Sequence, residues 1–257
     1  MLNLIEDFGL WLTSVFEYMG GILILLYETL ANIFKGKIKL ALTIDQMAIL
    51  GVNSLSIVIL TTGFAGMVIS LELAQLAVKY GVGSMVGGGV ALSMSREFAP
   101  MLTAIVVAGR AGSAIAAELG SMKVTEQIDA LKAMAISPVK YLVVPRFLAC
   151  LIMIPVLTLF ATLFGTVGGA FIAKYTANIQ FKVFFDSIKS MLDMADLWGG
   201  LYKAMVFAVE IALIGCFQGL TTTGGAAGVG KATTGSVVYS IILIFITNYF
   251  MSAWLFK

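Results

Sequence analysis

The feature of this sequence that most constrains its fold is a set of three long segments without a charged residue. They cover residues 46–71, 147–173 and 232–256. Each is longer than the roughly 20 residues that a helix needs to cross the hydrocarbon core of a bilayer. Two further apolar segments, residues 86–112 and 204–222, contain a few charges. The sequence therefore predicts an all-α integral membrane protein with five transmembrane helices.

The composition excludes several classes of function. Only 12% of the residues are charged, against roughly 25% in a soluble domain, and a net charge of +2 is too small to indicate nucleic-acid binding. The chain has no histidine, and Cys150 and Cys216 fall within predicted spans, where they are expected to act as small apolar residues. A Cys/His metal site and a Ser–His–Asp triad are therefore not expected, and neither is a cofactor bound by this chain.

The N-terminus is predicted to form a helix that lies along the membrane surface. Residues 8–27 are apolar, but Glu17 and the Gly20-Gly21 pair interrupt them, and Glu6 and Asp7 do not fit a cleaved signal peptide. The alternative is a sixth, imperfect span. We expect one domain over residues 1–257, in which residues 1–40 hold this interfacial helix and a basic linker and residues 46–256 form the five-span core.

The distribution of basic residues predicts an orientation. Eight of them precede the first span or lie in the loops on the same side: Lys35, Lys37, Lys39, Lys123, Lys132, Lys140, Arg146 and Lys231. Six are assigned to the other side: Lys79, Lys174, Lys182, Lys189, Lys203 and Lys257. The excess places the N-terminus in the cytoplasm and the C-terminus outside.

Small residues recur at every fourth position along the second span and its extension, at Ala104, Ala108, Gly112, Ala116 and Gly120. Such a ridge lets another helix approach closely, so the second span is predicted to be buried among helices. Gly165 and Gly169 in the third span predict a second close approach.

The second span also contains charges. Arg96 and Glu97 lie about ten residues into it, near the expected middle of the membrane, where a charge costs at least ~2.5–3.5 kcal/mol. Neighbours on a helix point about 100° apart, so each charge needs water or a partner on another helix. The candidate partners are Lys203, Glu210 and Asn248. The pair indicates either a cavity or a structural ion pair. Pro100 is expected to loosen the helix nearby, and Arg110 and Glu118 to anchor its cytoplasmic end.

Residues 123–138 are predicted to form a short amphipathic helix in the cytoplasm. Val124, Ile128 and Leu131 share one face at helical spacing, and Ser137-Pro138 ends the segment. Twelve residues make about 18 Å of helix, which is too short to cross the membrane. The helix either rests on the membrane surface or docks a cytoplasmic protein.

The segment GAAGVGKA, residues 225–232, nearly matches the phosphate-binding loop G-x-x-x-x-G-K-[ST]. Ala232 replaces the hydroxyl residue that would hold Mg²⁺, and no β-strand is predicted before it. We expect a flexible glycine-rich turn and no ATPase site in this chain. Energy for uphill transport would then come from another subunit.

The segment SREFAPMLTAIVVAGRAGSAIAAELGSMKVTEQIDALKAM resembles the signature of the MlaE family. The family pattern runs R-E-x-x-P, then A-G-R-x-G-S-A-x-x-A-E-x-G, then E-Q-I-x-A-L. The chain departs from it at Phe98-Ala99, where members commonly have Leu-Gly. The resemblance covers about residues 32–256.

Members of this family are permease subunits of ABC-type transporters that move phospholipids between the inner membrane and the outer envelope. The resemblance implies a homodimer, two ATPase subunits that bind ATP and Mg²⁺, and a ring of MCE-domain protein on the outer side. It implies location in the cell inner membrane, with a plastid envelope as an alternative. No catalytic residue is implied.

The resemblance also implies two sets of site residues. Those expected near the lipid, in a cavity between two protomers, are Arg96, Glu97, Leu71, Glu72, Gln75 and Asn248. Those expected to dock the ATPase subunit are Val124, Glu126, Ile128 and Leu131. Two other functions stay open from the residues alone, an ATP-independent channel or carrier and a membrane scaffold that only anchors other subunits.

Overall fold

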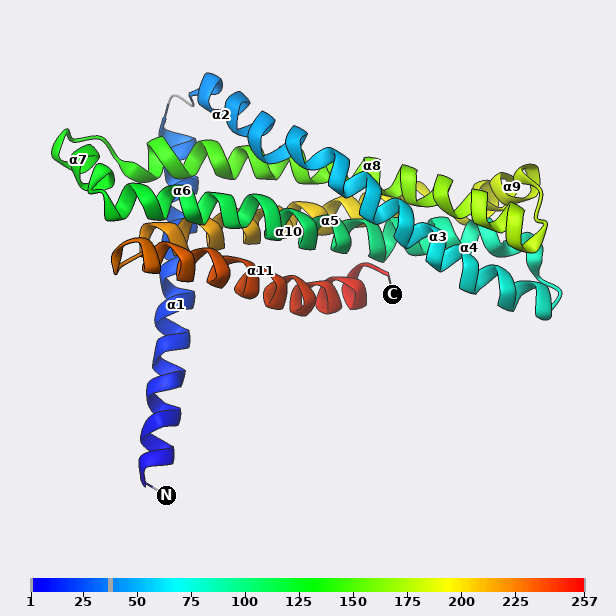
Figure 1. The fold of residues 1–257 in the computed structure, drawn as a ribbon, viewed down its shortest axis with the longest axis horizontal. Helices are drawn as coiled ribbons and strands as arrows, with labels where there is room; N and C mark the ends of the chain where they lie inside the picture. The colour runs from blue at the N-terminus through cyan, green and yellow to red at the C-terminus, as the bar shows by residue number, and fades with distance from the viewer. Residues whose placement is uncertain (1, 37–38, 257) are drawn as a thin grey trace.

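Five long apolar helices run side by side in the structure, a computed structural model (Figure 1). It describes residues 2–36 and 39–256, and of residues 2–8, 11, 14 and 15 only the backbone. Lys37 and Lys257 of the basic residues counted above lie outside the described residues, as do the side chains of Glu6 and Asp7. The five helical segments long and apolar enough to span a membrane are Leu40–Lys79, Gly83–Val124, Val139–Ala177, Met194–Leu220 and Gly225–Leu255. The predicted fold class and number of spans are therefore confirmed.

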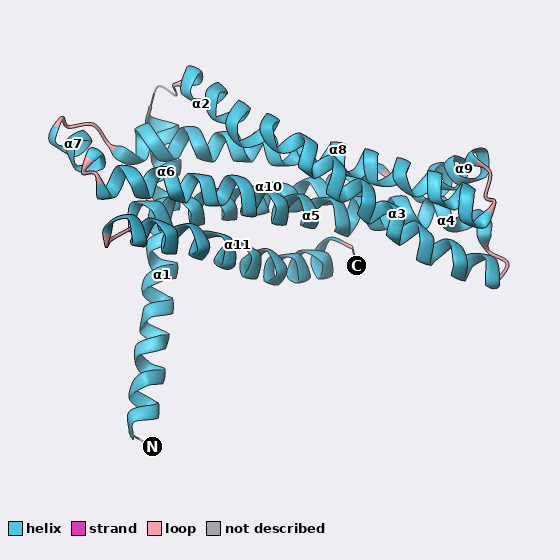
Figure 2. Cartoon of the chain, viewed as in Figure 1, coloured by secondary structure: helices cyan, strands magenta, loops and turns pink. Residues whose placement is uncertain are grey.

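The described part of the chain is helical throughout, without a strand (Figure 2). Short wide or tight turns join some helices within one span: the π-helical turns η1 (Met47–Gly51), η4 (Met94–Phe98), η5 (Ala108–Gly112) and η6 (Val139–Val143), and the 3₁₀ turns η2 (Val52–Ser54) and η3 (Gly83–Met85). The α-helices are α1 (Leu2–Lys35), α2 (Leu40–Gln46), α3 (Leu55–Lys79), α4 (Val86–Ser93), α5 (Ala99–Val107), α6 (Ser113–Val124), α7 (Gln127–Ala133), α8 (Val144–Ala177), α9 (Phe181–Met191), α10 (Met194–Leu220) and α11 (Gly225–Leu255).

Helix α1 crosses the other helices at a steep angle (Figure 1). It touches the end of the bundle that carries α7, where the Tyr18 ring packs edge-on against Phe217 at 5.2 Å and the Tyr18 hydroxyl lies 3.1 Å from Nε2 of Gln218. Leu25 is its buried apolar residue, and most of its other described apolar side chains are exposed. This transverse placement fits the predicted helix along the membrane surface, although α1 is longer than the segment 8–27 that we expected.

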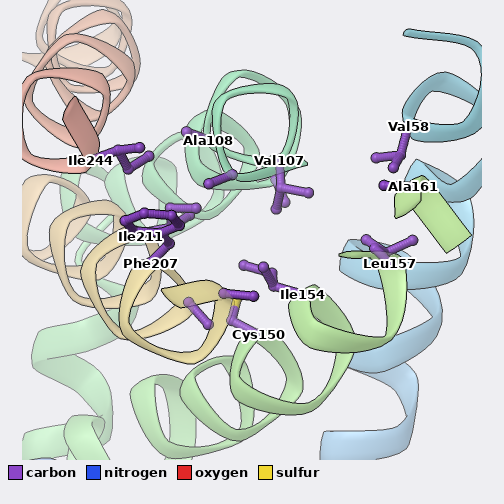
Figure 3. Packing of buried hydrophobic residues seen from close by; sticks show 14 of the residues in the cluster. Val58, Val107, Ala108, Cys150, Ile154, Leu157, Ala161, Phe207, Ile211 and Ile244 are labelled. Carbon is purple, nitrogen blue, oxygen red and sulfur yellow. The ribbon is translucent and has the colours of Figure 1, made fainter. Parts of the chain in front are cut away.

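The core lies where α8 packs against α3 and α10, and α10 against α6 and α11. Figure 3 shows its apolar side chains, which include Ile154, Leu157 and Phe207. Cys150 and Cys216 are buried and unbonded, as expected of small apolar residues. The bundle is therefore held by side-chain packing among four of its spans.

Glycines set the distance between α3 and α8. A Cβ added at Gly168 would lie 2.8 Å from the carbonyl oxygen of Gly63, and one at Gly169 would lie 3.3 Å from that of Gly66. The Ser70 hydroxyl donates a 2.7 Å hydrogen bond to the carbonyl of Gly169. The predicted close approach at Gly165 and Gly169 is confirmed, and its partner is the first span.

The small-residue ridge of the second span is buried along its whole length. A Cβ added at Gly112 would lie 3.3 Å from Ile211 of α10 and 3.6 Å from Ser236 of α11. The carbonyl of Gly112 accepts a 3.1 Å hydrogen bond from Ser236. The second span is therefore packed inside the bundle along this ridge, as predicted.

Two predicted segments differ in the structure. Residues 123–138 do not form one helix, because Glu126 adopts a left-handed conformation (φ 60°) between α6 and the seven-residue α7. Residues 225–232 are not a flexible turn, because they form the first turns of α11 behind Gly224, whose φ of 87° suits glycine. A single residue with positive φ decides the outcome in both places.

Candidate functional site

The charged pair of the second span is built around a break in the helix. The N–H of Ala99 reaches back to the carbonyl of Met94, which makes the wide turn η4, and Pro100 follows. Proline has no N–H, so the carbonyl of Arg96, four residues earlier, lacks its usual helical donor. The ammonium of Lys203 on α10 supplies that donor at 2.9 Å. The expected loosening at Pro100 thus opens a carbonyl to a side chain of another span.

Arg96 pairs with a residue that the sequence did not single out. Its Nε donates a 2.7 Å hydrogen bond to Oδ1 of Asp196, and its Nη2 lies 2.6 Å from the same oxygen. Oδ2 of Asp196 accepts from the backbone N–H of Asp193 as part of the capping box that begins α10. Asp196 therefore caps α10 and fixes Arg96 at the same time.

Glu97 pairs with three side chains from two other spans. Its Oε1 accepts from the Lys203 ammonium at 2.7 Å, and its Oε2 accepts from Asn248 at 3.1 Å and from Ser252 at 3.0 Å. Lys203 also donates to the Ser252 hydroxyl at 2.6 Å. The expectation that Lys203 and Asn248 are partners of the pair is confirmed. Glu210 is not, since it accepts from Thr247 instead.

The two members of this network differ in exposure. The side chain of Lys203 is fully buried, whereas those of Arg96 and Glu97 are each 35% exposed. Lys203 was counted above among the residues of the outer loops, and that count was wrong. Its removal widens the excess of basic residues on the other side, but the orientation itself stays a prediction.

The network lies toward one end of α10 and α11. Asp196 is in the first turn of α10, and Ser252 is in the last turn of α11. We expected the pair near the middle of the membrane. That expectation counted from the edge of the apolar segment, and the continuous helix Gly83–Val124 is far longer than one membrane crossing.

The remaining residues expected near a lipid lie on the second half of α3. Leu71 is half-buried, while Glu72 and Gln75 are exposed. Among the described residues, no hydrogen bond or ion pair joins them to Arg96 or Glu97. Asn248, from the same set, lies in the network. The sequence-based set is therefore divided between a connected cluster and an exposed stretch of the first span.

The residues expected to dock an ATPase subunit are also divided. Val124 ends α6, Glu126 is exposed in the turn, and Ile128 is only 2% exposed and packs into the core of this chain. Leu131 is partly buried against the same core. The shared free face of Val124, Ile128 and Leu131 was therefore a wrong prediction, because the chain turns at Glu126.

Two other charges join spans to one another. Nη1 of Arg110 donates to the Ser54 hydroxyl at 2.8 Å and to the carbonyl of Ile49 at 3.2 Å. Oε2 of Glu118 lies 2.8 Å from Nη2 of Arg146. Both charges connect the second span to a neighbouring span, as anchoring residues would.

Five apolar helices, a transverse helix across one end and a polar network toward the other define a polytopic membrane protein of the transport-permease class. Comparison with known proteins identifies the family. The family model "Permease MlaE" matches residues 43–254, and the chain belongs to that family.

Similar proteins span nearly all of this chain. It is 43% identical over 252 residues to a probable ABC transporter permease protein of Synechocystis sp., with 98% of this chain and 94% of the relative covered. It is 37% identical to a probable ABC transporter permease protein of Rickettsia typhi, over 100% of this chain and 99% of the relative. It is also 37% identical to TRIGALACTOSYLDIACYLGLYCEROL 1, a chloroplastic protein of Arabidopsis thaliana, over 97% of this chain and 72% of that protein. The chain is thus an ABC transporter permease by family.

Proposed function

We propose that this chain is the permease subunit of an ATP-driven transporter that moves phospholipids between the inner membrane and the outer envelope. It acts as a homodimer with two ATPase subunits and with an MCE-domain protein on the outer side. The N-terminus lies in the cytoplasm and the C-terminus outside. The ATPase subunits bind ATP and Mg²⁺, and this chain contributes no catalytic residue.

The observation that carries the proposal is the half-exposed guanidinium of Arg96 within a bundle of apolar helices. Asp196 engages Nε and Nη2, and Nη1 donates no hydrogen bond within the described part of the chain. A phosphate is a strong acceptor for such a free guanidinium N–H. Apolar walls with a few polar groups in reach suit a ligand with a phosphate head and two apolar tails. The network thus holds Arg96 in place and leaves one donor for a lipid.

The family supports the lipid class in a second way. The printed name of the Arabidopsis relative contains that of a galactolipid, trigalactosyldiacylglycerol. The lipid of this chain is proposed here to be a phospholipid because Arg96 offers a cationic donor, which a phosphate uses better than a neutral sugar does.

The α7 end of the chain is the proposed ATPase surface. Ile128 is buried there, but Met134 and Ile136 follow α7 with 62% and 39% of their surfaces exposed. Exposed apolar side chains beside a short helix offer a partner the anchors that interfaces commonly use. We therefore move the proposed docking residues from Ile128 and Leu131 to Met134 and Ile136, and keep the exposed Glu126 beside them.

Photo-crosslinking tests the lipid site. A photoreactive amino acid at Glu97 or Gln75 should capture a defined phospholipid in the assembled transporter, and capture should fall when ATP is added. The same amino acid at Phe160, which is exposed on α8, should capture only the average mixture of membrane lipids. Identical lipid mixtures at all three positions would contradict the proposal and leave Arg96 and Glu97 as a structural ion-pair network.

A further inference from the structure

A cavity of about 200 Å³ lies at the α7 end of the bundle, away from Arg96 and Glu97. It is enclosed by α2, α6 and the start of the third span, and its polar lining residues are Gln46, Glu118, Tyr141 and Arg146. Glu118 and Glu97 are 21 positions apart on the continuous helix Gly83–Val124, which is about 30 Å of helix rise. The cavity is therefore separate from the proposed transport site.

Arg146 lies in the wall of this cavity with one donor unused. Its side chain is 5% exposed, Nη1 donates to the carbonyl of Leu142 at 2.7 Å, and Nη2 pairs with Glu118. Its Nε is buried and has no acceptor in the described part of the chain. A buried guanidinium N–H without an acceptor is costly, so an acceptor from outside the chain would be favoured here.

Gln46 presents the complementary deficiency. Its Oε1 is buried and accepts no hydrogen bond from any described residue. The cavity thus offers one unused donor and one unused acceptor. A single water fills roughly 30 Å³ and would leave most of the space empty.

The charges around the cavity match a group with both signs. The ammonium of Lys39 lies 4.1 Å from the centre of the Tyr141 ring, which places a positive charge beside one lining residue. The carboxylate of Glu118 is about half exposed and places a negative charge beside another. Leu42, Met122 and Pro145 supply apolar walls.

We propose that this cavity binds the head group of a glycerophospholipid. The phosphate accepts from Nε of Arg146 and attracts Lys39, and a neighbouring amine or hydroxyl donates to Oε1 of Gln46 and faces Glu118. The apolar walls receive the start of the acyl chains. This is a resident lipid at the end of the bundle opposite the transport site, and it does not depend on what the transporter carries.

A photoreactive phosphatidylethanolamine with its diazirine in the head group tests the site on the purified full-length chain. Mass mapping should find the label in residues 42–46 and 141–146. Gln46→Leu should lower this labelling about tenfold, the effect expected of one hydrogen bond to a charged group. Gln180→Leu, an exposed substitution of the same kind on the far side, should leave it unchanged. Arg146→Lys, which keeps the charge but loses the Nε–H, should act like Gln46→Leu.

Competition identifies the source of the phosphate. Unlabelled phosphatidylethanolamine should compete strongly and free O-phosphoethanolamine only weakly, whereas dioleoylglycerol, which has no phosphate, should not compete. Labelling that is equal in the wild type and in Gln46→Leu would overturn the proposal, and so would its absence from residues 42–46 and 141–146. Binding of O-phosphoethanolamine without any labelling by the lipid would overturn the assignment to a lipid. Crosslinking at Glu97 is a separate readout, so the two proposals can fail independently.

Discussion

The ammonium of Lys203 lies 2.7 Å from Oε1 of Glu97, 106 residues earlier in the chain, and no part of the lysine side chain is exposed. The same ammonium donates to the carbonyl of Arg96 and to the hydroxyl of Ser252. One buried cation therefore connects the broken turn of the second span with α10 and α11. The two partners are unequally buried, and their removal should have unequal effects.

Glu97→Leu should destabilise the chain more than Lys203→Met. Removal of one partner from a buried ion pair costs about 3–5 kcal/mol, because the other charge stays buried and unpaired. Glu97→Leu leaves the fully buried Lys203 in that state. Lys203→Met leaves Glu97, which is partly exposed and keeps Asn248 and Ser252 as donors. The thermal midpoint of the purified variants in detergent measures the difference.

The double variant Glu97→Leu/Lys203→Met is the control for this comparison. It removes both charges and should be more stable than Glu97→Leu alone. Equal losses in the two single variants would show that Lys203 is reached by water in the folded protein, contrary to the burial described here.

Gly66→Ala should loosen the contact between α3 and α8. A Cβ at Gly66 would collide with the backbone of Gly165, and backbone atoms in a packed interface have no room to move. Gly63→Ala is the matched control on the same helix, since a Cβ there meets nothing within 4 Å. Gly66→Ala should lower the thermal midpoint, and Gly63→Ala should leave it equal or raise it, because alanine favours helix over glycine. The reverse order of midpoints would rule out this close approach.

Met134→Asp should separate the permease from its proposed ATPase partner without unfolding it. Met134 is exposed, so a charge there costs the free chain little and costs a packed interface much. Ile128→Asp should instead lower the yield of folded protein, because Ile128 lies in the core. Copurification of the two subunits, together with gel-filtration yield, distinguishes the outcomes.

Met194→Asp, an exposed position at the other end of the bundle, is the control for this experiment. It should leave copurification unchanged. If Met134→Asp also leaves it unchanged, the partner does not use this surface.

The stability of α7 should depend on pH only in strongly acidic solution. Hydrogen bonds from Lys123 and Lys132 hold the pKa of Asp129 below its ordinary value of 3.8. A group whose pKa is lowered on folding stabilises the fold above its unfolded pKa and loses this effect as the pH falls through the folded pKa. Amide exchange of α7, corrected for its intrinsic pH dependence, should be constant from about pH 7 to 5 and faster below about pH 4.

Asp129→Asn removes the titrating group and should abolish this acid dependence. The carboxylate is exposed, so solvent screens the interaction and the effect on α7 should be small. An acid-induced change that persists in Asp129→Asn would arise from another carboxylate.

Local patterns in the sequence predicted the spans and their packing faces well. The charge-free segments have lengths that only membrane helices need, and the repeated Ala and Gly positions of the second span and Gly165 and Gly169 of the third are buried against other helices as expected. Both features depend on spacing within one helix. The partners Lys203 and Asn248 could be named because few polar residues are available inside the other spans.

The rest depended on contacts that no local pattern encodes. Asp196 is 100 residues from Arg96 and was counted with an outer segment, although the S/T/D-x-x-D pattern of its capping box with Asp193 marks the start of α10. The left-handed Glu126 is equally hidden, since glutamate rarely adopts that conformation and helical spacing continues through it. Ile128 was therefore assigned to a free face when it belongs to the core.

The wide turn η5 has a consequence for the four-residue repeat from Ala104 to Gly120. In a regular α-helix each step of four residues advances about 40° around the axis, so four steps drift about 160° and carry the last position almost to the opposite side. A π-helical turn closes on the fifth residue instead and takes up one extra residue. Because η5 spans Ala108–Gly112 in the middle of the repeat, it cancels part of that drift. The integer period of the sequence and the fractional period of the helix are thus kept in phase by one inserted residue, and deletion of a single residue there would rotate everything that follows relative to α10 and α11.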